Sequence, residues 1–318
     1  MSPLRSWTDR HPVLVFALKT AAGAALLAAL VWYVDVHALI ASVRSARPEY
    51  LAAGAALAVV NLAVQFARWK YLLQTVRVRA TNATVFRSLA AGFTAGFFTP
   101  GQIGEIGGRL FALDGRQRAS ILTMSAVDKL YILGVTVAAG ILSAVIFFPL
   151  FLPAQWGAGL TTIAVLLLCA VLVGFLFPSL TKTLLLRLPE RIRNHRWYAV
   201  FKIFETDFHN STGQWLMLLT AAFFGIIILQ YHCFVNAFSP TPLTASALCV
   251  PIVLFVKSII LPVSIGDLGI RESASVFFYA RTGVPAAAAL GASLCIFAVN
   301  IVVPALLGIF VLFTSHKR

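Results

Sequence analysis

Runs of about twenty consecutive apolar residues recur along this chain, and a helix of about 20 apolar residues is long enough to cross a bilayer. Approximate bounds of six such runs are 13–34, 50–67, 127–148, 157–177, 214–235 and 286–313. Among the 318 residues, 60% are apolar and 11% are charged, whereas soluble proteins are about 25% charged. The sequence therefore predicts an all-α polytopic membrane protein with one integral membrane domain over 1–318, and it excludes ordinary soluble enzymes and disulfide scaffolds.

The net charge of +14 comes from Lys and Arg residues that cluster between the apolar runs. This distribution is typical of membrane topology rather than of nucleic-acid binding, so no nucleic-acid partner is expected. Residues 68–87 are rich in Lys and Arg and contain no acid, whereas 149–156 and 236–242 contain no Lys or Arg. By the positive-inside rule, both termini are expected in the cytoplasm of a bacterial inner membrane, with the loop at 35–49 outside.

Residues 180–210 form a basic connector between the two halves of the chain. Arginines alternate there with Trp, Tyr and Phe, a composition that suits a helix lying on the inner leaflet. We therefore expect this segment to be cytoplasmic or interfacial rather than membrane-spanning.

Two further apolar stretches, 85–98 and 243–261, are each followed by a Gly-rich segment that contains charges. The first would rise about 21 Å as a helix, which is less than a full crossing of a core about 30 Å thick. A complete crossing at 85–98 would also reverse the predicted side of every later loop. We expect two re-entrant hairpins that enter from opposite sides, with tips near 100–108 and 262–269 and a helix break at Pro251.

The two tips share a sequence pattern, P-x-x-I-G-[ED]-[IL]-G-x-R, which runs from Pro100 to Arg109 and again from Pro262 to Arg271. The copies lie about half the chain length apart, and each half would contain two spans, a hairpin and one span. These features predict inverted repeats over 1–150 and 157–318, the plan of many secondary transporters, whose interrupted segments mark a binding site near the midplane. The alternative is that the two segments are unrelated Gly-rich loops.

The P-G-x-x-G-E segment with a following Arg, and the later I-G-x-x-G-x-R-E segment, resemble the flippase-like transmembrane region of the lysylphosphatidylglycerol synthase family. The resemblance extends over nearly the whole chain and implies a stand-alone membrane module that moves or handles lipids between leaflets. Family members with aminoacyl-transferase activity carry a soluble catalytic domain after this region, and the present sequence ends shortly after Phe313. Synthase activity is therefore not implied. The matched positions are Pro100, Gly104, Glu105, Gly266, Gly269, Arg271 and Glu272.

Several charged residues fall at or near membrane depth, where one charge costs about 2.5–3.5 kcal/mol on insertion scales. Such charges must be paired or solvated. Gly-rich tips expose backbone N–H groups that favour anions, and an arginine can hold a phosphate with two parallel hydrogen bonds. The candidate substrate-binding residues are Arg109 and Arg271, with Glu105, Asp267 and Glu272 as their acidic neighbours and Pro100, Gly104, Gly107, Gly266 and Gly269 shaping the tips. The alternative is that each acid and the arginine four positions later form a local ion pair.

A second set of polar residues is predicted to line the same cavity or to couple transport to protons. Asp128 and Lys129 are adjacent on a helix and so point about 100° apart, which predicts different partners, or else contact with the cytoplasmic interface. Asn61, Gln65 and Arg68 follow one helix face, where they either line the cavity or hold helices together. Lys257 completes this set.

These features favour a membrane transporter or flippase for an anionic or phosphate-bearing lipid, because alternating access requires one site that opens to both sides. The alternatives are a membrane-embedded enzyme that modifies lipids, or a non-catalytic membrane subunit of a separate glycosyl- or aminoacyl-transferase. No nucleotide-binding loop or metal-ligand spacing occurs in the sequence, so no cofactor and no metal are expected. The expected partners are membrane lipids, with an enzyme of a lipid pathway as the partner in the subunit alternative.

Overall fold

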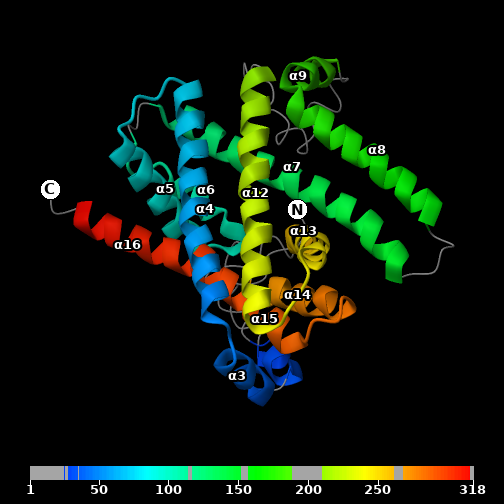
Figure 1. The fold of residues 1–318 in the computed structure, drawn as a ribbon. Coiled ribbons are helices and arrows are strands. Elements are labelled where there is room, and N and C mark those ends of the chain that lie inside the picture. The colour runs from blue at the N-terminus through cyan, green and yellow to red at the C-terminus, as the bar shows by residue number, and fades with distance from the viewer. Residues whose placement is uncertain are drawn as a thin grey trace, which may run out of the picture.

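The computed structural model describes residues 25, 28–34, 36–113, 117–151, 157–187, 210–260 and 268–315. Over these ranges the chain is helical and contains no strand (Figure 1). This confirms the all-α prediction. The helices of the first half are α3 (Val36–Arg44), α4 (Pro48–Thr75), α5 (Asn82–Phe97), η1 (Pro100–Gln102), α6 (Gly104–Gly108) and α7 (Arg118–Phe151). Those of the second half are α8 (Gly157–Leu176), α9 (Pro178–Leu186), α12 (Asn210–Phe238), α13 (Leu243–Ile259), α14 (Ile270–Arg281), α15 (Ala286–Phe297), η6 (Ala298–Val302) and α16 (Val303–Ser315).

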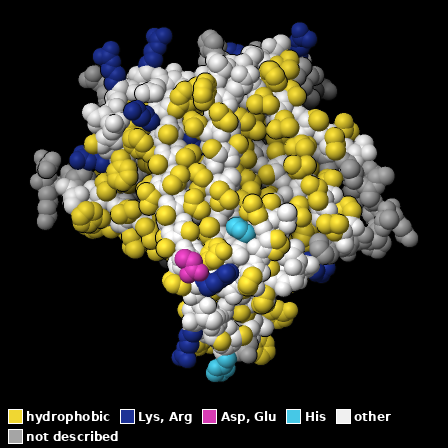
Figure 2. All heavy atoms as spheres, in the orientation of Figure 1, with side chains coloured by type: hydrophobic (Ala, Val, Ile, Leu, Met, Phe, Trp, Pro, Cys, Tyr) yellow, Lys and Arg dark blue, Asp and Glu magenta, His cyan; other side chains and the backbone are white. Residues whose placement is uncertain are grey.

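Four helical stretches in the described ranges are long and apolar enough to cross a membrane: Pro48–Thr75, Arg118–Leu150, Asn210–Phe238 and Ala286–Thr314. Two shorter apolar helices, Val165–Leu176 and Leu243–Ile259, accompany them. Most of the predicted first span, 13–34, lies outside the described residues. Figure 2 shows apolar side chains over the broad middle of one face, as expected for a surface that contacts lipid.

Long helices of the first half pack directly against long helices of the second half. Helix α4 lies beside α12 (Figure 1), α5 packs on α16, and α13 packs on α7. Glycines permit two of these contacts, because a Cβ at Gly308 would meet the Ala90 carbonyl of α5 and one at Gly140 would meet Phe255 of α13. The two halves therefore form one closely packed helical body.

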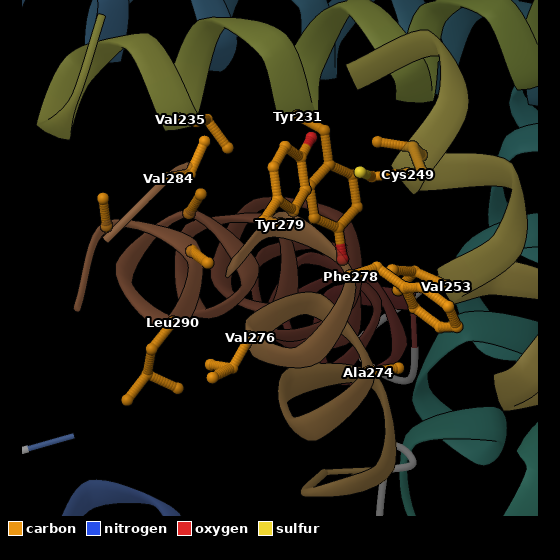
Figure 3. Close-up of a cluster of buried hydrophobic side chains, with 14 of the residues drawn as sticks. Tyr231, Val235, Cys249, Val253, Ala274, Val276, Phe278, Tyr279, Val284 and Leu290 are labelled. Atoms are coloured by element: carbon orange, nitrogen blue, oxygen red, sulfur yellow. The ribbon is translucent and has the colours of Figure 1, made fainter. Parts of the chain in front are cut away.

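This body contains two apolar cores, each built mainly from one half. In the first half, buried side chains around Trp69 and Tyr131 join α4, α5 and α7. In the second half, the cluster in Figure 3 lies between α12, α13, α14 and α15, and Tyr279 at its centre donates a hydrogen bond to Ser246 (3.1 Å). Because a buried hydroxyl needs a partner, this bond orients the ring within an otherwise apolar cluster.

One sequence prediction about a helix boundary, the break at Pro251, is wrong. Helix α13 continues through Pro251 instead of breaking there, and α7 continues through Pro149 to Phe151. A proline removes one backbone hydrogen bond, and packed neighbours in a helix bundle can compensate for that loss. The predicted loop at 35–49 contains the helix α3. Of the basic connector at 180–210, α9 covers 180–186, and 188–209 lie outside the described residues.

Candidate functional site

The first predicted tip is a helix-turn-helix in which α6 folds back along α5. The chain turns at Gly101 and Gln102, which both have left-handed backbone angles (φ 65° and 56°). The Thr99 hydroxyl stabilises the turn by accepting a hydrogen bond from the Gly104 N–H (2.8 Å). The turn places the short helix that carries Glu105 and Arg109 against the first core.

Two glycines of this tip have different surroundings. A Cβ at Gly104 would lie 2.6 Å from Thr99 Oγ1 and would also collide with the Ala95 carbonyl, whereas a Cβ at Gly107 would meet nothing within 4 Å. Gly107, which the sequence pattern places among the residues that shape the tip, is therefore not needed for its packing, because this residue faces open space. At Gly104 the close approach of α6 to α5 excludes any side chain.

The matched substitutions Gly104→Ala and Gly107→Ala test this packing. Gly104→Ala is expected to lower the free energy of unfolding by about 1–3 kcal/mol, because the neighbouring backbone cannot move away. Gly107→Ala is expected to change it by less than about 0.5 kcal/mol. The measurement is thermal unfolding of both variants in detergent. Equal midpoints for the two variants would contradict the close packing of α6 on α5.

A buried network of five charged side chains joins the first tip to α4 and α7. Asp128 accepts from Arg68 through Oδ1 (2.5 Å) and from Arg109 through Oδ2 (2.9 Å). Glu105 accepts from Arg109 through Oε1 (2.5 Å) and from Lys129 through Oε2. The prediction that Asp128 and Lys129 face different partners is confirmed. The local pair of Glu105 with Arg109 also exists, but it is only one link in this network.

Neighbouring polar and aromatic groups hold Arg109 in place. Its guanidinium lies over the Trp69 ring (4.6 Å to the centroid), and the Trp69 indole N–H donates to Ser88 Oγ (3.1 Å). The Ser88 hydroxyl in turn donates to the Arg109 carbonyl (2.5 Å). Ser88 is absent from the predicted set, because a single serine in an apolar helix gives little signal of such a role. These contacts show that Arg109 is bound tightly within the protein.

The second tip is described only from Leu268 onwards, so Gly266 and Asp267 lie outside the described residues. Gly269 precedes α14 with a φ of 94°, a conformation that favours glycine, and its N–H donates to Glu272 Oε2 (2.7 Å). Arg271 donates through Nε to Glu272 Oε1 (3.1 Å) and to Ser293 Oγ (3.2 Å). In the described part of this tip, the arginine therefore pairs with the acid that follows it.

A cavity of about 190 Å³, with both apolar and charged side chains in its wall, lies between the two halves of the chain. Aromatic side chains, including Phe93, Phe97 and Phe223, form part of its wall. Of the predicted residues, Asn61, Gln65, Glu105, Lys129, Lys257 and Arg271 line it, whereas Arg68, Arg109, Asp128 and Glu272 lie behind its wall. The structure thus brings charged side chains from both halves to one space.

Amide side chains form a second polar network beside this cavity. Asn61 donates to Gln230 Oε1 (3.3 Å) and accepts from Gln65 (2.7 Å), and Asn300 donates to the same Gln230 oxygen (3.0 Å). The predicted stripe on α4 therefore both lines the cavity and connects helices. Gln230 and Asn300 are absent from the predicted set, because a single amide within an apolar run gives little signal of such a role. Asn300 lies in the π-helix η6, a local irregularity that is frequent at functional sites.

The fold and this site define an all-helical integral membrane protein whose two halves enclose a charged cavity. A family model described as the lysylphosphatidylglycerol synthase TM region matches residues 16–308. The chain therefore belongs to this family, which links it to lipid metabolism or translocation. Comparisons with curated proteins and with solved structures found no match.

Proposed function

We propose that this protein moves an anionic or phosphate-bearing lipid between the leaflets of the bacterial inner membrane. The observation that carries this proposal is the cavity of about 190 Å³ lined by charged residues of both halves. Pockets for whole drug-sized ligands measure about 300–1,000 Å³. The cavity is thus suited to a lipid head group, while the acyl chains stay in the hydrocarbon of the bilayer.

The charges that line the cavity favour a negatively charged head group. Lys129, Lys257 and Arg271 bring three positive charges to its wall, and the carboxylates of Glu105 and Glu272, which pair with Lys129 and Arg271, offset two of them. Charges in a site of low polarity interact strongly with a ligand of opposite sign. In this proposal Arg109 positions Glu105 and Lys129 from behind, whereas Arg271 contacts the lipid phosphate with its guanidinium.

The packing of the two halves supports transport by alternating access. The hairpin helix of each half packs against the last span of the other, as α5 does with α16 and α13 with α7. In the inverted-repeat arrangement that we propose, two hairpins would enter from opposite sides and meet at the cavity. If the two halves exchanged their conformations, the cavity would open first to one face of the membrane and then to the other.

The proposed orientation predicts which side of the membrane is accessible at two exposed positions. With the four native cysteines replaced by alanine, Arg79→Cys should be labelled only from the cytoplasm and Thr244→Cys only from outside. The reason is that the Lys- and Arg-rich segment after α4 should remain inside, and α4 and α12 place these two positions at opposite ends of the bundle. Labelling of both cysteines from the same side would contradict the orientation.

Purified protein in liposomes tests the transport activity. Fluorescent phosphatidylglycerol is incorporated in both leaflets, and a membrane-impermeant reductant bleaches the label that reaches the outer leaflet. Protein-containing vesicles should lose the protected inner-leaflet signal, whereas protein-free vesicles retain it, and the test is run with and without a proton gradient. A protected fraction that stays unchanged under both conditions would contradict transport and favour a subunit role. A change in the mass of the lipid would favour an enzyme.

A further inference from the structure

Helix α3 carries a row of exposed apolar side chains at one end of the molecule. We infer that this helix lies at the membrane surface and inserts the row among the lipids of one leaflet, the outer leaflet in the orientation proposed above. Val36, Ile40 and Val43 form this apolar stripe and are 46%, 45% and 57% exposed. Figure 1 shows α3 beyond the start of α4, at the end of the molecule where α12 also ends. The stripe is a lipid contact outside the cavity and does not require that the protein transports lipid.

The side chains of α3 divide into three faces. Successive helical residues point about 100° apart, so positions i, i+4 and i+7 return to one face. Leu39 packs on the apolar core of the second half, and α3 contacts α15. The apolar stripe adjoins this protein-facing side, and the exposed residues His37, Ala41 and Arg44 lie on the face beyond the stripe. Protein, lipid and water follow one another in the same order around a helix at a membrane surface.

The neighbouring helix ends place α3 at the boundary of the membrane. The Arg47 N–H donates to the Ala237 carbonyl (2.8 Å), so the start of α4 meets the end of α12. Arg47 and Glu49 bring charges to this point, and charged side chains are unfavourable in the hydrocarbon but not at its boundary. Only residues 45–47 connect α3 to α4. The helix therefore lies close to the level at which the long helices leave the hydrocarbon.

Two aromatic side chains extend the contact surface on the N-terminal side of α3. Trp32 and Tyr33 are 85% and 76% exposed. Trp and Tyr are enriched at membrane–water interfaces, because the ring contacts hydrocarbon while the polar atom contacts water. Arg44 on the adjoining face can reach lipid phosphates. Aromatic rings, an apolar stripe and a cation on the next face are the combination that binds a helix between acyl chains and head groups.

Quenching of a fluorescent label at different depths tests this placement. In a full chain whose four native cysteines are replaced by alanine, Ile40→Cys and Ala41→Cys are each labelled with a small fluorophore. The protein is reconstituted in liposomes of phosphatidylcholine and phosphatidylglycerol that carry bromine on the acyl chains, either near the head group or near the chain end. Bromine near the head group should quench the label at position 40 several-fold more than the label at position 41. Iodide on both sides of the membrane should show the opposite preference.

A position within a long helix supplies the reference for deep lipid contact. Val59 is 70% exposed on α4, so Val59→Cys should be quenched most by bromine near the chain end. Ile40→Cys should be quenched most by bromine near the head group, which distinguishes a helix at the membrane surface from part of a span. Val43→Cys repeats the test on the apolar stripe, and Arg44→Cys repeats it on the polar face.

Three results would overturn this placement. The first is equal quenching of positions 40 and 41 by bromine near the head group. The second is stronger iodide quenching at position 40 than at position 41, which would place the stripe in water. The third is protection of position 40 from both quenchers, which would show that protein covers the stripe, and a disulfide-linked dimer of unlabelled Ile40→Cys would identify that protein as a second copy of the chain. None of these results depends on transport, so this placement and the proposed function can fail separately.

Discussion

Replacing Asp128 by leucine is expected to destabilise the protein more than any other single substitution in the charge network. Asp128 is the common partner of Arg68 and Arg109, both of which are almost inaccessible. Its removal leaves Arg68 without its carboxylate partner, and losing one partner of a buried ion pair costs about 3–5 kcal/mol. The midpoint of thermal unfolding in detergent and the amount of folded protein should both fall strongly.

Two further variants show whether this loss comes from the network. The double variant Arg68→Leu, Asp128→Leu should recover part of the stability, because it no longer buries an arginine beside a missing acid. Glu49→Leu changes an exposed acid at the start of α4 and should alter stability by less than about 0.5 kcal/mol. A midpoint for Asp128→Leu equal to that of the parent would show that the network is not structural.

Arg271→Gln is expected to cause the largest loss of transport while folded protein still accumulates. Arg271 lines the cavity, and only a guanidinium can hold a phosphate with two parallel hydrogen bonds. Arg271→Gln removes the ion-pair partner of Glu272 and should lower stability, but Glu272 still accepts hydrogen bonds from the Gly269 N–H (2.7 Å) and from Ser293 (3.2 Å), which support the fold. Transport of phosphatidylglycerol in liposomes should fall at least about tenfold, the cost of one charge-assisted contact.

A control on the same helix distinguishes binding from general loss of charge. Arg281→Gln, at the exposed end of α14, should transport at the parent rate. Arg271→Lys should restore little activity, because an ammonium cannot form the paired contact. Parent-rate transport by well-folded Arg271→Gln would assign Arg271 to the scaffold and would remove the main support for the anionic-lipid proposal.

The cost of charges at membrane depth makes their pairing predictable from the sequence alone. It does not identify the partners. The pair of Glu105 with Arg109 follows from their spacing of one helical turn, but the pair of Arg68 with Asp128 joins residues from different helices. Only the packing of α4, α6 and α7 determines that Asp128 binds two arginines and that Lys129 binds Glu105.

Neutral parts of the site are harder to predict than charged ones. Gln230 and Asn300 lie within apolar runs, where an amide costs far less than a charge and so demands no explanation from the sequence. Their roles depend on a contact between α12 and η6 that no local pattern encodes. The same limit applies to Gly107 and Pro251, since residue type alone does not show whether neighbours crowd a glycine or compensate for a proline.

Protection of a single cysteine by lipid tests most directly whether the cavity binds the substrate. Ser258 lines the cavity, is exposed, and donates to the Leu254 carbonyl of its own helix (2.8 Å). Ser45 is a matched control, since it is exposed and bonds in the same way to Ala41 (3.0 Å). In a chain whose native cysteines are replaced by alanine, short-chain phosphatidylglycerol should slow thiol labelling of Ser258→Cys several-fold and leave Ser45→Cys unchanged. Labelling of Ser258→Cys at the same rate with and without the lipid would contradict a lipid head-group site in this cavity.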